Sequence, residues 1–217
     1  MRYLIFSDSH LTHHFDASKY AVLKEAISHA DRVIINGDFW DGFSTTFEQF
    51  VQSPWKDNLF PLLKKKKTVY IYGNHDAAAY SDKRASLFSE KQATTYAFDS
   101  GDITIHCEHG NRLVPLIDEW LHTRMPPAAN KIYSTFEDAM VKVFAHSYLR
   151  LAYAKFNKIA KEKIRSEGHT NYVAIGHTHF AEHDAANRFL NSGIIQHGLA
   201  QYIYIEDGTI TPVEKKY

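Results

Sequence analysis

The chain of 217 residues carries 25 basic and 25 acidic side chains, which gives a formal net charge of +0. This balance offers no electrostatic basis for binding nucleic acid, so we expect no such partner. The length and a hydrophobic fraction of 44% predict one globular domain over residues 1–217. The single cysteine, Cys107, excludes an intramolecular disulfide and, without a signal-peptide pattern, predicts a cytoplasmic protein.

Five short apolar segments, rich in Val, Ile and Tyr, each run into polar residues. Their lack of polar alternation is typical of strands that are covered on both faces of a sheet. The segments are RYLIFSDSH (residues 2–10), DRVIINGDFWD (31–41), TVYIYGNHD (68–76), DITIHCEHGN (102–111) and NYVAIGHTH (171–179). Because α/β sheets place their sites just past the carboxyl ends of strands, these polar residues are the first candidates for function.

Helical patterns connect the first three segments. Residues 18–30 have apolar side chains at helical spacing, with Ser18 as the expected N-cap. Residues 47–67 predict further helix, broken near Pro54 and Pro61. The chain therefore begins with a βαβ arrangement, which predicts parallel strands.

The second half of the chain adds two hairpins and a helical insertion. The hairpins are expected around Ser100–Gly101 and Asp207–Gly208, and their antiparallel strands predict mixed sheets. Residues 111–167 have no strand signal, and no Gly or Pro occurs from Ser134 to Arg165. This insertion predicts one long helix or a helical pair. It either packs on the domain in the ordinary amphipathic way or forms a cap that shapes substrate choice.

Seven side chains at the strand ends can bind a metal through oxygen or imidazole nitrogen. They are Asp8, His10, Asp38, Asn74, His109, His177 and His179. Seven donors exceed the needs of one ion, whereas two ions that share one carboxylate would use them all. Asp38, which follows Gly37, is the expected bridge. The prominence of histidine favours Mn, Fe or Zn over Mg or Ca, with manganese expected first, and His75 is left for catalysis.

Each motif also has a structural explanation when it is taken alone. An Asp-x-His after a strand is more often structural, and GHTH can be a polar turn. The occurrence of all the motifs in one order, each at a strand end, favours the metal site. The run Lys64–Lys67 is explained most simply as a solvated helix C-terminus. Together with aromatic residues in the insertion, it also motivates a peripheral contact with a membrane surface.

The ordered motifs resemble the calcineurin-like metallophosphoesterase family. They are D-x-H (Asp8, His10), GD-x-x-D (Asp38, Asp41), GNHD (Gly73 to Asp76), HG (His109, Gly110) and GHTH (Gly176 to His179). The resemblance covers residues 8–179. It implies an α/β fold, a four-layer α/β/β/α sandwich of two mixed sheets, with a binuclear metal centre at their edge.

The resemblance also implies a role for each side chain. Asp8, His10, Asp38 and His179 would bind one metal ion, and Asp38, Asn74, His109 and His177 would bind the other. His75 would stabilise the transition state or protonate the leaving oxygen, while Asp41 and Asp76 would orient the ligands and His75. We therefore predict a binuclear metal-dependent phosphoesterase, with His75 and Asp76 as catalytic residues. A metal-bridging hydroxide would attack a phosphate monoester, a diester or a pyrophosphate.

One branch of this family is suggested further. The helical insertion and residues Asn191 to Gly208 resemble the UDP-2,3-diacylglucosamine pyrophosphohydrolases of lipid A synthesis. His75 and Asn111 differ from the pattern of that branch, so a small-molecule phosphoester of another kind is the broader expectation. The alternative from another class is a non-catalytic scaffold of the same fold. Such scaffolds tend to lose metal ligands, which this chain keeps.

Overall fold

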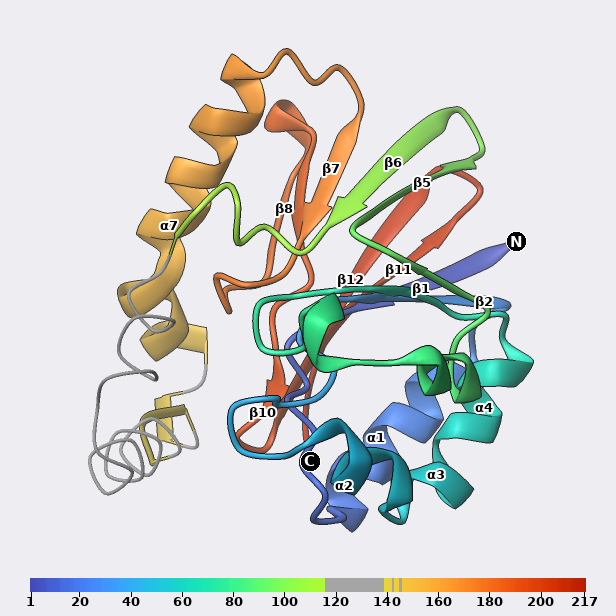
Figure 1. Cartoon of the computed structure of the whole chain (residues 1–217). Coiled ribbons are helices and arrows are strands. Elements are labelled where there is room, and N and C mark those ends of the chain that lie inside the picture. The colour runs from blue at the N-terminus through green and yellow to red at the C-terminus, as the bar shows by residue number, and fades with distance from the viewer. Residues whose placement is uncertain (116–138, 142, 145) are drawn as a thin grey trace.

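The computed structural model describes residues 1–115, 139–141, 143–144 and 146–217, and this part of the chain forms two β-sheets (Figure 1). The larger sheet has the strand order β10-β11-β1-β2-β3-β4, with β12 paired to β11. Its strands are β1 (Arg2–Phe6), β2 (Arg32–Asn36), β3 (Val69–Ile71), β4 (Lys91–Ala93), β10 (Ile195–Gln196), β11 (Leu199–Glu206) and β12 (Thr209–Lys216). Strands β1 to β4 run parallel and β11 runs antiparallel to β1, so this sheet is mixed, as predicted.

The smaller sheet has the strand order β5-β6-β7-β9-β8. Its strands are β5 (Thr95–Ser100), β6 (Ile103–Glu108), β7 (Tyr172–Ile175), β8 (Glu182–Asp184) and β9 (Phe189–Asn191). Strands β6, β7 and β9 are parallel, and β5 and β8 pair antiparallel at the two edges. Both predicted hairpins are confirmed. Gly101 turns β5 into β6, and Asp207 and Gly208, both at positive φ, turn β11 into β12.

Helices cover the outer face of each sheet. Helices α1 (Ala17–Ser28), α2 (Phe47–Gln52), α3 (Trp55–Asn58) and α4 (Phe60–Lys65) pack on the larger sheet. Helix α7 (His146–Ser166) packs on the smaller sheet, on the opposite side of the molecule (Figure 1). Short 3₁₀ helices are η1 (Ala78–Tyr80), η2 (Lys83–Leu87) and η3 (Ala185–Asn187). The predicted α/β/β/α order of layers is confirmed.

An apolar layer between the two sheets holds them together. Ile5, Ile34 and Ile71 of the larger sheet meet Cys107 and Leu190 of the smaller one, and all five are fully buried. Complete burial of such a side chain contributes about 1.5–3 kcal/mol, so this layer fixes how the ends of the two sheets face each other. Burial in this apolar layer also raises the pKa of the Cys107 thiol.

Helix α1 begins earlier than the sequence pattern predicts. Asp16 is the N-cap, because its carboxylate accepts a hydrogen bond from the backbone N–H of Lys19 at 2.9 Å, and the prediction of Ser18 is wrong. The predicted breaks in the next helical segment are confirmed in a modified form. Pro54 separates α2 from α3, whereas Pro61 lies in the first turn of α4, where its missing N–H costs nothing.

The predicted helical insertion at residues 111–167 lies partly outside the described residues, which exclude 116–138, 142 and 145. Within the described part, α7 confirms a helix over 146–166. Its apolar side chains Ala160 and Ile164 pack against Val173 and Phe189 of the smaller sheet, which is ordinary helix-on-sheet packing. The role of a substrate cap stays a prediction. Among the described residues, no helix has both the length and the apolar character needed to cross a membrane.

Candidate metal centre

The polar residues after five strands meet at one end of the two sheets. Asp8 follows β1, Asp38 follows β2 and Asn74 follows β3, while His109 and His177 follow β6 and β7 of the other sheet. Backbone hydrogen bonds continue past the strands, from Asp8 N–H to the Gly37 carbonyl (3.1 Å) and from Gly176 N–H to the His109 carbonyl (2.9 Å). The parallel pairing therefore extends into the loops and places their side chains together, as the strand-end pattern predicts.

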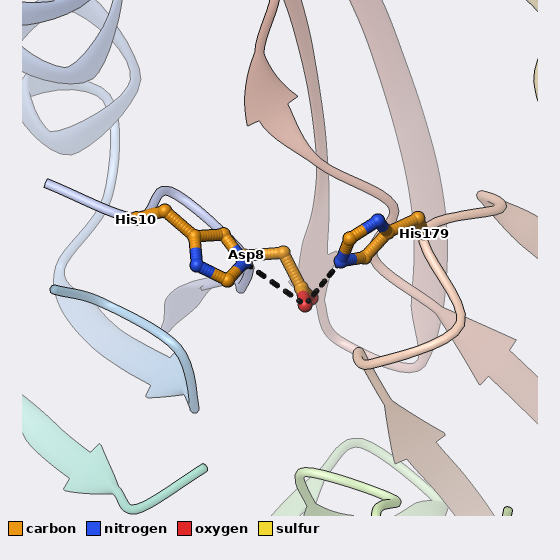
Figure 2. A group of neighbouring side chains, drawn as sticks. All are labelled: Asp8, His10 and His179. Carbon is orange, nitrogen blue, oxygen red and sulfur yellow. Dashed lines mark ion pairs between the residues drawn. The ribbon is translucent and has the colours of Figure 1, made fainter. Parts of the chain in front are cut away.

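Asp8, His10 and His179 form the first group of candidate ligands, and one ligand atom from each lies within 4.8 Å of the others. Figure 2 shows the two imidazole rings on either side of the Asp8 carboxylate. The Nε2 atom of His179 is 3.3 Å from Oδ1 of Asp8, and the Nε2 atom of His10 is 3.9 Å from the same oxygen. Loops from both sheets thus supply this group.

Asp38, His109 and His177 form the second group with the same spacing. The Nε2 atom of His109 is 3.1 Å from Oδ2 of Asp38 and 3.0 Å from Oδ1 of Asn74. Oδ2 of Asp38 also lies 3.8 Å from Nε2 of His10, which belongs to the first group. Asp38 therefore faces both groups, in the position that a bridging carboxylate needs.

Hydrogen bonds at the far side of two imidazoles select the nitrogen that faces the site. Nδ1 of His109 is 2.9 Å from the Asn36 carbonyl, so it carries the proton it donates there and Nε2 faces Asp38. Nε2 of His177 lies 2.8 Å from the Val114 carbonyl, so Nδ1 is the nitrogen that faces the site. Such bonds from metal-binding histidines to backbone carbonyls fix both the tautomer and the ring orientation.

Five of the seven predicted ligands have a left-handed backbone. The φ angles are 51° for Asp8, 40° for His10, 52° for Asp38, 62° for His177 and 57° for His179. Each such residue costs on the order of 1–3 kcal/mol relative to a relaxed backbone, and this strain concentrates at functional sites. Asp and His tolerate the conformation better than most residues. The fold therefore holds these residues in strained backbone conformations, which direct their side chains into the site.

Two glycines allow the loops to approach each other closely. A Cβ atom on Gly73 would lie 2.1 Å from Oδ1 of Asp38 and 2.6 Å from its backbone nitrogen. A Cβ on Gly37, where φ is 90°, would lie 2.3 Å from Nδ1 of His109. Gly37 thus has the sharp turn that the sequence predicts, and it also makes room for a ligand from the other sheet.

The charges in the site are strongly coupled. Burial alone would raise the pKa of Asp38, but the neighbouring His109 and His75 hold it well below its usual value. Burial lowers the pKa of His10 to about 3, with help from His75. For His109, burial also acts to lower the pKa, but the Asp38 carboxylate outweighs it and raises the pKa to about 10. Asp38 therefore favours its ionised form, and His10 favours its neutral form.

A divalent cation fits this arrangement. The Nε2 atom of His10 is buried and has no hydrogen-bond partner, although it faces the carboxylates of Asp8 and Asp38. A buried polar atom without a partner costs about 1–3 kcal/mol. A cation between these three groups removes this cost. The donor set of oxygen and imidazole nitrogen suits a transition metal or zinc.

His75 lies beside the two groups, and one of the two carboxylates expected to orient it and the ligands is in contact with it. Its Nδ1 atom is 3.1 Å from Oδ1 of Asp41. Asp76 accepts backbone hydrogen bonds from Asp38 (3.1 Å), Phe39 (2.7 Å) and Gly73 (2.6 Å). Asp41 therefore orients the His75 ring, and Asp76 ties two loops of the site together. A direct catalytic role of Asp76 stays a prediction.

His75 is also close enough to be a metal ligand. With His10 and Asp38 it forms a third group whose candidate ligand atoms lie within 4.8 Å of one another. Its ring stands nearly perpendicular to that of His10, with 4.3 Å between the centroids. The expectation that His75 touches no metal therefore stays a prediction, and the metal content of a variant can test it.

A buried polar cluster behind the GHTH loop escaped the sequence analysis. Asn157, Thr178 and Asn191 are at most 1% exposed and are joined by hydrogen bonds. One signal was present, because Asn191 ends the apolar strand β9 in the same way that the predicted ligands follow theirs. Asn157 lies within a helical pattern and carries no comparable signal.

The sequence and the fold are similar to those of known proteins. The family model described as calcineurin-like phosphoesterase matches residues 1–181. No curated protein matches the sequence.

Among solved structures, Yfce, a phosphoesterase from E. coli, is similar with a TM-score of 0.50 and 15% identity, over 98% of each chain. A conserved uncharacterized protein from Streptococcus pneumoniae, titled a predicted phosphoesterase, has a TM-score of 0.47 and 16% identity, over 99% of this chain and 88% of that one. Vps29 from Entamoeba histolytica, complexed with zinc, has a TM-score of 0.48 and 14% identity, over 100% and 99%. At 15% identity, the similarity to Yfce indicates a shared fold alone.

Proposed function

The chain belongs to the calcineurin-like phosphoesterase family, and we propose that it hydrolyses a phosphoester or phosphoanhydride bond with two divalent metal ions. The position of Asp38 carries the proposal. Its Oδ2 lies 3.8 Å from Nε2 of His10 and 3.1 Å from Nε2 of His109, so one carboxylate serves both ligand groups. Two-metal hydrolases need such a bridge, because two cations about 3.5–4 Å apart repel each other strongly.

The residues divide into two ligand sets that share this carboxylate. Asp8, His10, Asp38 and His179 would hold one ion, and Asp38, Asn74, His109 and His177 would hold the other. When bound, the ions would supply Lewis acidity toward phosphoryl oxygens and water. The fixed loops would supply orientation, because the strained backbone and the bonds from Asp76 to both loops hold the ligands before substrate arrives.

His75 and Asp41 would handle the proton of the leaving group. Asp41 accepts a hydrogen bond from Nδ1 of His75, which holds the ring. The proton on Nε2 would then pass to the leaving oxygen as the bond to phosphorus breaks. The ring of Phe43 lies 4.3 Å from that of His75 and limits how the imidazole can turn. Such acid catalysis is worth about 10²–10⁴-fold.

The substrate class is the open part of the proposal. Yfce is named a phosphoesterase, which supports ester hydrolysis as the general reaction. A nucleotide-lipid pyrophosphate remains one candidate from the sequence, but none of the comparisons supports that branch. A non-catalytic scaffold is disfavoured because all seven predicted ligands and His75 are kept together. We therefore propose a small-molecule phosphoester as the substrate, with manganese ahead of iron and zinc as the metal.

A substrate screen tests this function. Metal-free protein is reconstituted with Mn, Fe or Zn, and then assayed on phosphate monoesters, diesters, nucleotide pyrophosphates and UDP-diacylglucosamine. We expect hydrolysis of at least one class that depends on added metal and is lost in Asp38→Asn. The matched control is Asp184→Asn, which removes a carboxylate that belongs to neither ligand group and pairs with Lys161. Wild-type protein that binds metal but hydrolyses none of these classes would favour the scaffold instead.

A further inference from the structure

Helix α7 carries a fully buried amide side chain next to apolar residues that pack on the smaller sheet. Asn157 is 0% exposed, and its neighbours along the helix, Phe156 and Ala160, pack with the smaller sheet. Burying an amide without partners costs free energy, so such a side chain persists only where every polar atom is bonded. The hydrogen-bond partners of this amide therefore indicate its role.

Asn157 uses the full hydrogen-bonding capacity of its amide. Its Nδ2 donates to the Phe180 carbonyl (2.9 Å) and to the Glu182 carboxylate (2.8 Å). Its Oδ1 accepts from the Thr178 hydroxyl and from Nδ2 of Asn191 (3.0 Å). Two donors and two acceptor positions are all that an asparagine side chain offers. A buried network in which every member is bonded is rigid.

These bonds surround one metal ligand. Thr178 and Phe180 are the chain neighbours of His179, and Thr178 also follows His177. Both histidines have a left-handed backbone, with φ of 62° for His177 and 57° for His179. The loop therefore has a conformation that it would not keep by itself, and Asn157 bonds to it on both sides of His179.

Other side chains on the same face of α7 reach the same region. Tyr153, one turn before Asn157, places its ring 5.6 Å from the ring of His179. Lys161, one turn after, pairs with Glu182 (2.7 Å) and Asp184 (2.8 Å) in the strand that follows the loop. The spacing of four residues puts all three on one face of the helix. Asn157 bonds to residues 178 and 180 themselves.

We propose that Asn157 is a positioning residue, which holds the His177–His179 loop in the conformation that metal binding requires. The inference rests on the proposed metal-dependent function. Helix α7 would then stabilise the loop that carries His177 and His179, in addition to covering the smaller sheet. Groups that orient metal ligands typically change metal affinity by about 10–100-fold when they are removed.

The test is a metal titration of the metal-free protein with cobalt(II), whose visible spectrum reports the ligand geometry. Asn157→Leu keeps the volume of the side chain and removes its four bonds. We expect it to weaken cobalt binding by about 10–100-fold and to alter the spectrum. Thr178→Val removes one of the same bonds at the loop itself, so it should shift affinity in the same direction. If Asn157→Leu does not fold, the Thr178→Val variant provides the test.

Two control variants on α7 separate positioning from general destabilisation. Ile164→Ala removes packing between α7 and the smaller sheet, and Arg165→Met removes the hydrogen bond to Asn187 (2.6 Å). Neither change removes a bond of the network around Asn157, so we expect any loss of melting temperature to leave cobalt affinity changed by less than about threefold.

Each outcome bears on a different claim. Asn157→Leu and Thr178→Val that bind cobalt as the wild type does would overturn the positioning role alone. The same conclusion follows if Ile164→Ala, at an equal loss of melting temperature, weakens binding equally. Wild-type protein that binds no cobalt would overturn the proposed function, and the inference with it.

Discussion

The imidazole of His75 touches the Asp41 carboxylate through Nδ1, so Nε2 is the nitrogen that can deliver a proton. His75→Asn should lower kcat by about 10²–10⁴-fold for substrates with a poor leaving group. The loss should shrink for p-nitrophenyl esters, whose leaving group needs little protonation. Both rates and the metal content are measured on the same preparation.

Asp41→Asn is the matched variant, because it keeps the shape of the partner and removes its charge. It should show the same dependence on the leaving group, in a weaker form. A His75→Asn protein that has lost a metal ion would make His75 a ligand, as its closeness to His10 and Asp38 allows. If His75→Asn lowers kcat equally for substrates with poor and good leaving groups, His75 does not act as the general acid.

His109 makes metal binding depend on pH. Its pKa in the metal-free fold is raised to about 10, since the Asp38 carboxylate outweighs the effect of burial. The proton on His109 therefore stabilises the metal-free fold fully below the ordinary pKa of 6.5, and this stabilisation is lost as the pH rises through about 10. A metal ion that binds at Nε2 must displace that proton, so metal affinity should increase with pH across this window.

Calorimetry in two buffers with different ionisation enthalpies measures this proton directly. At about pH 7.5, metal binding should release about one proton from His109. His109→Gln provides the control, since it removes the titrating group and should abolish that release along with much of the affinity. A binding heat that is the same in both buffers would contradict the assignment of His109 as a ligand.

At the scale of the loops, Gly73 allows the loop after β3 to lie against the loop after β2, so that the candidate ligands of both loops come close to each other. Gly73→Ala would place a Cβ atom 2.1 Å from Oδ1 of Asp38 and 2.6 Å from its backbone nitrogen. Since backbone cannot move aside easily, we expect a loss of about 1–3 kcal/mol in the free energy of unfolding and weaker metal binding. Thermal unfolding with and without metal measures both.

Gly168→Ala is the matched control for that change. Gly168 has a positive φ of 77° and nothing within 4 Å of an added Cβ. Its substitution should therefore cost stability through backbone strain alone and leave metal affinity unchanged. A Gly73→Ala protein that binds metal normally would show that the contact between these loops is not needed.

The elements differ in how far sequence could predict them. Strand ends such as those at Asp8 and His109 can be predicted from the sequence, because an apolar run stops abruptly at polar residues. The start of α1 was missed because Asp16 and Ser18 are both good caps, and only the path of the preceding loop selects Asp16. The bond between Asn157 and Asn191 joins residues 34 apart in a contact that no local pattern encodes.

The sequence predicted which side chains the structure brings together, but not their individual contacts. Seven side chains of three types stand at strand ends, and parallel strands bring their carboxyl ends together. The division of roles between Asp41 and Asp76 was not predictable, since both follow a strand and both are carboxylates. Their directions depend on how the two loops pack, which the sequence does not state locally.

At the scale of the whole molecule, both sheets must be complete for the site to exist. Residues beyond 181, where the family match ends, form β8 to β12 and pair with β1, β7 and with one another. This arrangement agrees with one domain over residues 1–217, which stays a prediction. Ligands from the larger sheet meet ligands from the smaller one only because the apolar layer between the sheets aligns them.

Contact with a membrane surface also stays a prediction at this scale. Two of the four lysines that motivate it, Lys64 and Lys66, donate hydrogen bonds to the carbonyls of Ser89 and Ala30 within the protein. Lysines held in this way contribute less to a mobile basic patch than solvated ones do. Co-sedimentation with anionic vesicles, compared between wild type and a variant with Lys65 and Lys67 changed to Gln, would measure what remains.

The metal content of reconstituted protein tests the central claim most directly, namely that Asp38 joins two metal sites. Wild type, Asp8→Asn and Asp38→Asn are loaded with manganese, freed of excess metal and analysed for metal per chain. We expect about two ions in the wild type, about one in Asp8→Asn and clearly less than one in Asp38→Asn. Wild-type protein with well under one ion, or equal losses in the two variants, would contradict the shared carboxylate.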